Sequence, residues 1–244
     1  MTLKLFLIRA RKLLVALMNP RILRAFLRSG VMASSEHRVI LARPWRTIVD
    51  IGANRGQFAL AAREWTKAQI VSFEPLPGAV QVFRHALEGD ARVRVHQLAI
   101  GPDVREGTMH VSGRDDSSSL LAIGGEQSRL FPGTGEVGTL SVRVAPLSST
   151  IDAEEIAPPA LLKLDVQGYE YDALLGCENL LSKFSGIYCE CSFIELYEGQ
   201  RLAFEVIALL VERGFVLSGM YNPTYDDEGR CIQADLWFSS SDRT

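Results

Sequence analysis

Hydrophobic and polar positions follow two periods along most of this chain. Short apolar runs, typical of buried strands, alternate with longer segments in which apolar residues recur every three or four positions, as in helices. This alternation predicts an α/β fold with a mostly parallel sheet covered by helices on both faces. The predicted strands are 46–51, 70–74, 92–100, 160–165, 186–192, 214–220 and 231–238, and the predicted helices are 56–66, 77–88, 169–182 and 200–213.

The stretch from Gly101 to Ser141 interrupts this rhythm. Within it, residues 106–112 can pair with residues 140–144 as an antiparallel excursion, which leaves the glycine- and serine-rich segment 113–138 as a long loop. Loops of this length inside a compact domain are usually functional or disordered. We expect this one to be a lid that faces the substrate.

The N-terminus has a pattern of its own, and we expect a helical appendage over 1–42 before a catalytic domain over 43–244. A helix over 3–18 would gather its apolar residues on one face and leave its cations off that face. Asn19 and Pro20 are typical of the start of a second helix, which Ser29 and Gly30 can end.

Charge is distributed unevenly. Residues 1–30 carry seven Lys or Arg and no acid, which gives them a charge of +7. Because the net charge of the whole chain is −3, the remaining residues carry −10. So acidic a body lacks the clustered cations that phosphate contacts require, which argues against a nucleic-acid partner. The basic, amphipathic head fits peripheral contact with an anionic membrane. The alternative is that its apolar face docks on the domain or on a second subunit of a homo-oligomer.

Localisation follows from what the sequence lacks. No apolar run near the start approaches the roughly 20 residues of a membrane span. The four cysteines form no C-x-x-C pair and have no zinc spacing. We therefore expect a cytoplasmic protein with reduced cysteines, either free or peripheral at the inner membrane surface.

The chemistry is concentrated after the first predicted strand, where Asp50 to Gly56 reads as strand, glycine loop and helix. Glycines let a backbone approach a ligand, and a helix start offers free N–H groups. The spacing G-x-x-x-G departs from the dinucleotide fingerprint G-x-G-x-x-G, which disfavours the alternative of an NAD-dependent oxidoreductase. Glu74 ends the second strand, 24 positions after Asp50, where a carboxylate can accept hydrogen bonds from ribose hydroxyls.

Together these segments indicate S-adenosylmethionine as the cofactor. Glu74, followed by Pro75, is the expected ribose ligand. Leu98 and Ala99 would flank the adenine, although the apolar trio that ends at Ile100 serves equally well as core. The residues expected at the methionine end are Asp50, Gly52, Asn54 and Gly56.

Several segments share the motifs of one known family: 50–58, 73–75, 162–170 (L-K-L-D-V-Q-G-Y-E, similar to a K-x-D-x-[EQ]-G-x-E signature), 189–192, 196–200 and 233–236. Over about residues 45–238 the chain resembles the FkbM-type methyltransferases. The resemblance implies a Rossmann-like class I fold with strand order 3-2-1-4-5-7-6 and an antiparallel last strand. It also implies methyl transfer from S-adenosylmethionine to an oxygen, commonly a sugar hydroxyl of a polysaccharide or glycolipid precursor.

Carboxylates supply the candidate catalytic groups. The first, second, fourth and fifth strands end in Asp50, Glu74, Asp165 and Glu190, and strand ends meet at one edge of a parallel sheet. Asp165 is the first choice for a general base, a role worth about 10²–10⁴-fold. Glu190 and Glu170 are orienting partners or substitutes.

Alternatives remain for these acids. Asp165 could hold a divalent cation, but no complete metal-ligand set stands out, so no metal is predicted. Asp165 could also form a structural salt bridge with Lys163. Glu170 suits a helix start regardless of catalysis. Tyr197 could face a sugar ring or cover the edge of the core. His110, in the irregular region, could be a base, but the four histidines share no spacing and are expected to face solvent: His37, His85, His96 and His110. A cofactor-binding scaffold without turnover is a further alternative.

Overall fold

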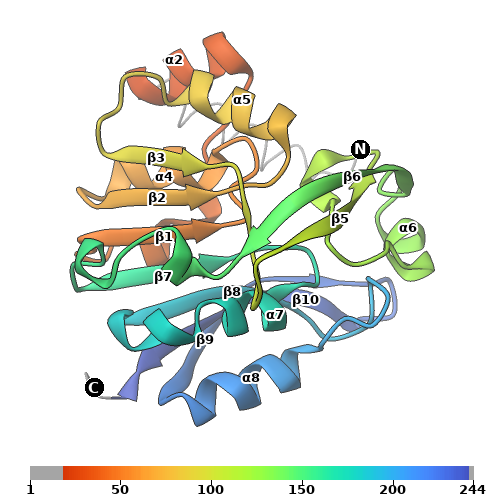
Figure 1. Ribbon diagram of the computed structural model, residues 1–244. Helices are drawn as coiled ribbons and strands as arrows, with labels where there is room; N and C mark the ends of the chain where they lie inside the picture. The colour runs from red at the N-terminus through yellow and green to blue at the C-terminus, as the bar shows by residue number, and fades with distance from the viewer. Residues whose placement is uncertain (1–18, 242–244) are drawn as a thin grey trace.

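The protein is described here by a computed structural model over residues 19–241 (Figure 1). Its centre is a seven-stranded sheet made of β1 (Thr47–Ile51), β2 (Gln69–Phe73), β3 (Val93–His96), β7 (Ala160–Leu164), β8 (Gly186–Ser192), β9 (Phe215–Tyr225) and β10 (Cys231–Ser240). The order is β3-β2-β1-β7-β8-β10-β9, and β10 runs antiparallel to both of its neighbours. The expected order 3-2-1-4-5-7-6 and the antiparallel last strand are confirmed.

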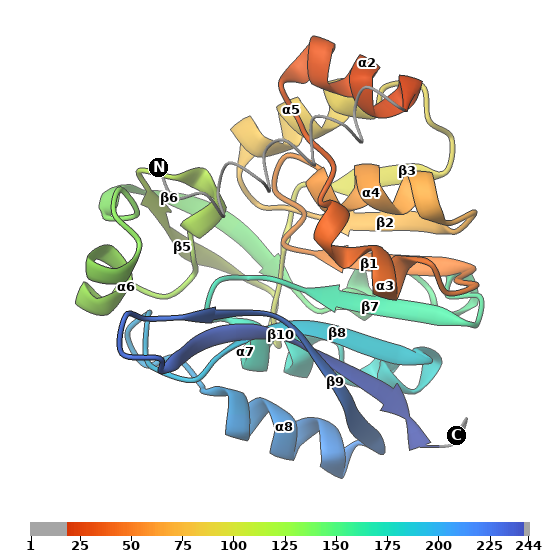
Figure 2. The ribbon, with the colours of Figure 1, turned by 180° about the vertical axis from the view of Figure 1, so that it is seen from behind.

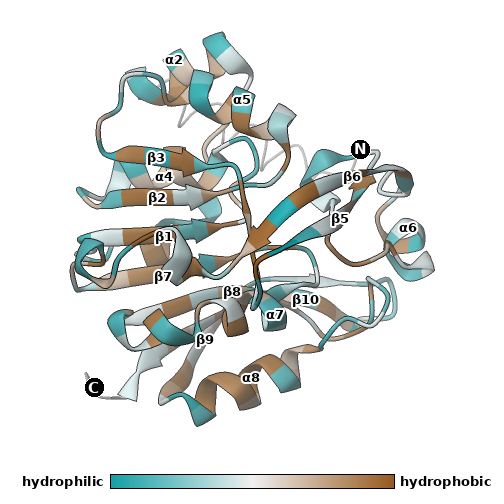
Figure 3. Cartoon of the chain, viewed as in Figure 1, coloured by the Kyte–Doolittle hydropathy of each residue, from teal (hydrophilic) through white to brown (hydrophobic). Residues whose placement is uncertain are grey.

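The central strands β1 and β7 are buried along their whole length. Their side chains alternate between the two faces, so Val49 and Leu162 join one core while Ile48 and Leu161 join the other. Strands covered on both faces are expected to be almost continuously apolar. Figure 3 shows this in β2 and β7.

Helices cover both faces of the sheet. The face that carries Ile48 is covered by α3 (Arg38–Leu41) and α4 (Gln57–Trp65), which Figure 2 shows in front of the strands. The opposite face is covered by α7 (Glu170–Gly176) and α8 (Ala203–Glu212). The helix predicted over 169–182 therefore ends early, and a 3-10 segment, Glu178–Lys183, follows it.

The N-terminal helix α2 (Pro20–Ser29) has the predicted ends. The Asn19 side chain accepts hydrogen bonds from the N–H groups of Arg21 and Ile22, and Gly30 closes the helix at φ +71°. Ile22 and Ala25 are buried, and α2 lies beside α5 (Pro77–Ala86) (Figure 1). This helix docks on the domain; the amphipathic helix expected over 3–18 lies outside the described residues. Within residues 19–241, every helix is too short or too polar to cross a bilayer.

A second sheet stands beyond the carboxyl ends of the main strands. It consists of β4 (Ala99–Ile100), β6 (Glu136–Ala145) and β5 (Arg105–Ser112) in that order. The expected antiparallel pair is confirmed, with Thr108 opposite Ser141. The single strand predicted over 92–100 is wrong: β3 ends at His96, and the chain turns so that Ala99 pairs with Val144 of β6.

The segment predicted as a loop, 113–138, contains a helix, α6 (Gly125–Leu130). Its two initial glycines, Gly124 and Gly125, hide it in the sequence because glycine is a poor helix former. Tertiary packing stabilises the helix instead: Gln127 is buried, and Leu130 packs on the cluster around Leu196.

Candidate functional site

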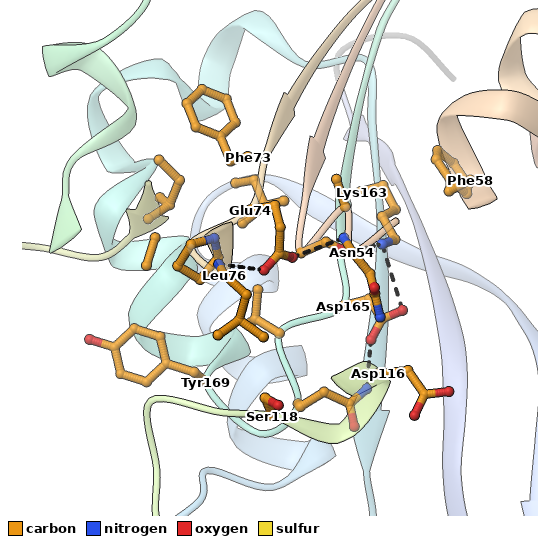
Figure 4. Close-up of a pocket in the computed structure, with 18 of the residues that line it drawn as sticks. Asn54, Phe58, Phe73, Glu74, Leu76, Asp116, Ser118, Lys163, Asp165 and Tyr169 are labelled. Atoms are coloured by element: carbon orange, nitrogen blue, oxygen red, sulfur yellow. Dashed lines mark hydrogen bonds and ion pairs between the residues drawn. The ribbon is translucent and has the colours of Figure 1, made fainter. Parts of the chain in front are cut away.

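A cavity of about 280 Å³ opens where the carboxyl ends of β1, β2 and β7 meet the second sheet (Figure 4). Its volume lies near the lower end of the range for small-molecule sites. Three parts of the chain line it: the loops after the three strands, the second sheet with the segment that follows β5, and residues 34–37 from the N-terminal region. The position agrees with the general location of ligands in open parallel sheets.

Gly52 and Gly56 shape the loop after β1. Both have left-handed backbones, at φ +77° and +92°. A Cβ on Gly52 would lie 1.8 Å from the Asp165 carbonyl oxygen, and one on Gly56 would lie 2.9 Å from the Phe83 ring. The two glycines are therefore required by the approach of other protein segments as well as by backbone conformation.

Four N–H groups of this loop already have acceptors inside the protein. Those of Gly52 and Ala53 both donate to the Phe73 carbonyl at 3.0 Å, and that of Gly56 donates to Ala53. The N–H of Asn54 donates to Glu74 at 2.9 Å. These four N–H groups are thus engaged within the protein and are not the free anion donors that the sequence suggested.

Glu74 lies on the cavity wall with its carboxylate fixed from behind. Its Oε2 accepts the bond from Asn54, and its Oε1 accepts one from the N–H of Leu76 at 2.8 Å (Figure 4). Burial raises the pKa of Glu74 to about 7, although the two backbone hydrogen bonds act to lower it. Each carboxylate oxygen can accept more than one hydrogen bond, so the group can also receive donors from the cavity.

Asn54 carries an acceptor that lacks a partner. Within the described residues its Oδ1 is buried and receives no hydrogen bond, while the residue itself lines the cavity. An unpaired buried oxygen costs about 1–3 kcal/mol, which a ligand donor would recover. Asn54 thus fits a ligand that brings an N–H or ammonium group.

One side of the cavity is apolar. Leu98 and Ala99 line it together with Ile100, Met109 and Leu120. Leu98 and Ile100 also belong to the main hydrophobic core, so the trio serves both as wall and as core.

Asp50 does not reach the cavity wall. It is fully buried, directly opposite Lys163 in the neighbouring strand, and its Oδ1 lies 3.1 Å from the Lys163 Nζ. That Nζ also donates to the Gly52 carbonyl at 3.1 Å. Burial acts to lower the pKa of Lys163, but the attraction of Asp50 and Asp165 outweighs it and raises that pKa above its ordinary value. Lys163 is therefore held as a buried cation under the glycine loop.

Asp165 faces the cavity at the end of β7, and its side chain is 38% exposed. Its Oδ2 lies 3.6 Å from the Lys163 Nζ, which is the salt bridge considered from the sequence. Its Oδ1 accepts a hydrogen bond from Gln167 Nε2 at 2.7 Å. One oxygen is thus hydrogen-bonded within the protein, and the other faces the Lys163 ammonium.

Gln167 connects several candidate residues, and sequence reasoning gave it no role. Its Nε2 also donates to Glu190 Oε2 at 3.0 Å, and its Oε1 accepts from the Tyr197 hydroxyl at 2.9 Å. Glu190 therefore lies behind Gln167 rather than on the cavity wall. The Gln233 side chain donates a hydrogen bond to its other oxygen, Oε1, at 2.7 Å. The sequence feature that could have pointed to Gln167 was its position in the signature segment, between Asp165 and Gly168.

Glu170 and Tyr197 fix the turn after β7. Glu170 is buried, and its Oε1 accepts hydrogen bonds from the N–H groups of Val166 and Gly168 at 3.0 and 3.1 Å. Burial raises its pKa to about 7. Tyr197 is 1% exposed and packs where a Cβ on Gly168 would lie, at 2.8 Å. A sugar ring cannot stack on so buried a ring, so Tyr197 covers the core edge.

His37 was expected to face solvent, and this prediction is wrong. Its side chain is 16% exposed and lines the cavity. Its ring packs edge-on against Phe58 at 5.3 Å, and its Nδ1 lies 3.1 Å from the Tyr188 hydroxyl. No spacing rule could have found it, because its polar partners, Tyr188 and Asp235, lie more than 100 positions along the chain.

The segment after β5 supplies the rim of the cavity. Asp115, Asp116 and Ser118 line the opening, and Arg55 ties the rim to the glycine loop through an ion pair with Asp115 at 2.6 Å. Part of the segment expected to form a lid thus does face the cavity.

Comparison with known proteins agrees with this geometry. Residues 50–217 match the methyltransferase FkbM domain family. The 2-O-methyltransferase NoeI of Sinorhizobium fredii is 30% identical over 168 residues, which are 66% of this chain and 69% of that protein. The 31-O-demethyl-FK506 methyltransferase FkbM of Streptomyces tacrolimicus is 27% identical over 227 residues, or 83% and 81% of the two chains.

Among solved structures, magnesium protoporphyrin IX methyltransferase from Synechocystis PCC 6803, with bound S-adenosylmethionine, superposes at a TM-score of 0.46 with 11% identity, covering 85% of this chain and 76% of that one. The family match extends over more than half of the chain and includes the glycine loop, Glu74 and the turn after β7. The protein is therefore an S-adenosylmethionine-dependent methyltransferase that belongs to the FkbM methyltransferase family.

Proposed function

We propose that the enzyme methylates a hydroxyl oxygen of a sugar in a polysaccharide or glycolipid precursor. The observation that carries this proposal is the polarity of the cavity. One end is apolar beside the buried carboxylate of Glu74, and the other is lined by Asp116, Ser118 and Asp165. The two relatives named above support transfer to oxygen, since one is a 2-O-methyltransferase and the other acts on a 31-O-demethyl compound.

The apolar end suits the nucleoside of the cofactor. Glu74, with Pro75 beside it, would accept hydrogen bonds from both ribose hydroxyls. Leu98 and Ala99 would lie against the adenine. Asn54 Oδ1 would accept a hydrogen bond from the amine at the methionine end. Gly52 and Gly56 would shape this part of the cavity. S-adenosylmethionine supplies a methyl group on a positively charged sulfur.

Asp50 would act indirectly at the methionine end. It holds the Lys163 ammonium, and Lys163 in turn holds the Gly52 carbonyl. The negative charge of Asp50 is thereby balanced before any ligand binds. We assign Asp50 to positioning the glycine loop.

The acidic end suits an acceptor rich in hydroxyl groups. Hydroxyls donate strong hydrogen bonds to carboxylates, and Asp116 and Asp165 both line this part of the cavity. Clustered carboxylates repel phosphates, which favours a neutral sugar over a nucleotide or a nucleic acid. Because Gln167 and Lys163 hold the Asp165 oxygens in place, Asp165 would accept a hydrogen bond from a neighbouring hydroxyl of the sugar and so position the reacting hydroxyl.

Orientation is the main contribution that such a site can make. Holding the acceptor oxygen in line with the methyl carbon contributes about 7–11 kcal/mol in well-oriented systems. Glu190 would keep Gln167 in place, and Glu170 would keep the turn after β7 closed. We assign both to positioning rather than to proton transfer.

The acceptor class can be tested directly. The full chain is incubated with S-adenosylmethionine and a panel of neutral methyl glycosides, phenols, aliphatic alcohols and amines, and products are identified by mass spectrometry. We expect a methyl ether on a glycoside hydroxyl together with S-adenosylhomocysteine. Methylation of phenols or amines, with every glycoside left unmodified, would contradict the proposal.

We also propose peripheral contact with anionic membranes. Helix α2 exposes Arg21, Arg24 and Arg28, and Leu27 beside them is 74% exposed. Cations near apolar side chains favour an anionic bilayer surface. The full chain should sediment with vesicles that contain phosphatidylglycerol and much less with pure phosphatidylcholine vesicles. Equal sedimentation with both would contradict this proposal.

A further inference from the structure

His37 belongs to a polar cluster at the acceptor end of the cavity, in which Tyr188 and Asp235 are buried and Asn222 is exposed. The cluster joins three strands to the N-terminal segment: Tyr188 lies on β8, Asn222 on β9 and Asp235 on β10. His37 Nδ1 is 3.1 Å from the Tyr188 oxygen and 3.6 Å from Asp235 Oδ2. Residue 37 also lies outside the part of the chain that matches the methyltransferase family, which begins at residue 50.

The hydrogen bonds determine which nitrogen of His37 carries the proton. Tyr188 donates its only proton to Asp235 Oδ2 at 2.8 Å, so its oxygen can only accept from His37. The Asn222 amide donates to the same Asp235 oxygen at 2.7 Å. Neutral His37 is therefore protonated on Nδ1, and its Nε2 carries the lone pair.

That lone pair is open to the cavity. Among the residues that the structure describes, none is hydrogen-bonded to His37 Nε2. This nitrogen is nevertheless not a fully buried atom without a partner, so it keeps some exposure. It is therefore accessible, and His37 is one of the residues that line the cavity. Glu36, Lys163 and Asp165 are charged residues that line the same cavity and act on His37.

We infer that His37 is the general base of the methyl transfer and that Tyr188 and Asp235 orient it. The inference rests on the proposed transfer to a hydroxyl. The hydroxyl proton passes to Nε2 while the acceptor oxygen bonds the methyl carbon and the methyl–sulfur bond breaks, leaving its electron pair on sulfur. The imidazolium then loses its proton to water. A nitrogen base oriented by a buried acid follows the general logic of activated nucleophiles.

The surroundings of His37 suit this role. Burial lowers its pKa, while the charges of Asp235 and Glu36 act to raise it, Lys163 acts to lower it and Asp165 to raise it. The net result is a pKa of His37 below its ordinary value of 6.5, so His37 is neutral and able to accept a proton at pH 7. Asp165 is less suited, because its Oδ1 already accepts a hydrogen bond from Gln167 and its Oδ2 faces the Lys163 ammonium at 3.6 Å.

The state of His37 can be tested without an acceptor. Nitrogen-15 NMR of the histidine-labelled full chain should show the Nδ1–H tautomer and a pKa below 6.5. Asp235→Asn removes a charge that raises the pKa of His37, so the variant should titrate at still lower pH. The exposed His85 should not respond. An Nε2–H tautomer, or a titration indifferent to Asp235→Asn, would overturn the inference.

The catalytic role is tested by the pH profile of kcat. In the wild type kcat should rise with pH through the pKa of His37, and Asp235→Asn should move that limb to lower pH. His37→Gln should abolish the limb and lower kcat about 10²–10⁴-fold, with S-adenosylhomocysteine binding unchanged within about twofold; His85→Gln should match the wild type. A limb that persists in His37→Gln overturns the assignment.

The two proposals fail in different ways. Transfer by the wild type to non-sugar acceptors alone would contradict the sugar acceptor and leave the His37 limb in place. If His37→Gln does not fold, Asp235→Asn decides instead: a parallel shift of the NMR pKa and the kinetic limb supports the assignment, and a kinetic limb that does not follow the NMR pKa overturns it.

Discussion

Gly52 and Asp165 meet through their backbones, so closely that a Cβ on residue 52 would lie 1.8 Å from the Asp165 carbonyl oxygen. The contact joins the loop after β1 to the turn after β7. One loop carries Asn54, which holds Glu74, and the other carries the catalytic candidate Asp165. The positions of the proposed cofactor site and acceptor site are therefore coupled.

Gly52→Ala should disrupt both sites at once. The methyl group would collide with backbone, and φ of +77° adds strain of about 1–3 kcal/mol for a non-glycine residue. We expect urea unfolding to show a loss of about 3 kcal/mol or more. Gly78→Ala is the matched control, since a Cβ there meets no atom within 4 Å. Equal stability of the two variants would contradict the steric account.

Glu170 should tolerate amidation but not truncation. Glu170→Gln keeps an oxygen for the N–H groups of Val166 and Gly168, so its activity should stay near that of the wild type. Glu170→Ala leaves two buried donors unpaired, at about 1–3 kcal/mol each. Thermal and urea unfolding separate these outcomes. A large loss of kcat in Glu170→Gln at unchanged stability would point to a catalytic role for Glu170.

The same residue should make stability depend on pH. Its folded pKa of about 7 lies above the ordinary 4.5, so the unfolded chain releases this proton at lower pH than the folded protein does. Stability should therefore fall as pH rises from about 4.5 to about 7, by an amount on the order of 3 kcal/mol from this group. Glu170→Gln should flatten that decline, as measured by urea unfolding across this range. An unchanged slope would contradict the raised pKa.

The sequence predicted the parts of the site that local patterns encode. Residues 50–56 and Glu74 follow buried strands with characteristic spacing, and the structure has the predicted strand, loop and helix there. The end of β3 was missed because the partner of Ala99 is Val144, 45 positions away. His37 was missed because its surroundings come from β8 and β10 and from α4, and burial by distant strands leaves no local signal.

Tyr197→Phe should loosen the acceptor side. The Tyr197 hydroxyl lies within hydrogen-bond distance of Gln167 Oε1 and of the Ser117 carbonyl, at 2.9 and 3.0 Å, so it links the turn after β7 to the rim. We expect a stability loss of about 1–2 kcal/mol and a higher KM for the acceptor. Tyr225→Phe, at a residue that is 54% exposed, is the control. An unchanged acceptor KM would argue against this link.

The most direct test of the account is isothermal titration of S-adenosylhomocysteine into the wild type, Glu74→Gln and the exposed control Glu154→Gln. We expect saturable binding at one site, with Kd raised about 10-fold or more in Glu74→Gln and unchanged in the control, since charge-assisted hydrogen bonds contribute about 1.5–3 kcal/mol. Wild-type affinity should also weaken as pH falls below about 7, where Glu74 takes up a proton. Equal affinity in all three proteins, or saturation by NAD with no heat from S-adenosylhomocysteine, would contradict the assignment of this cavity to S-adenosylmethionine.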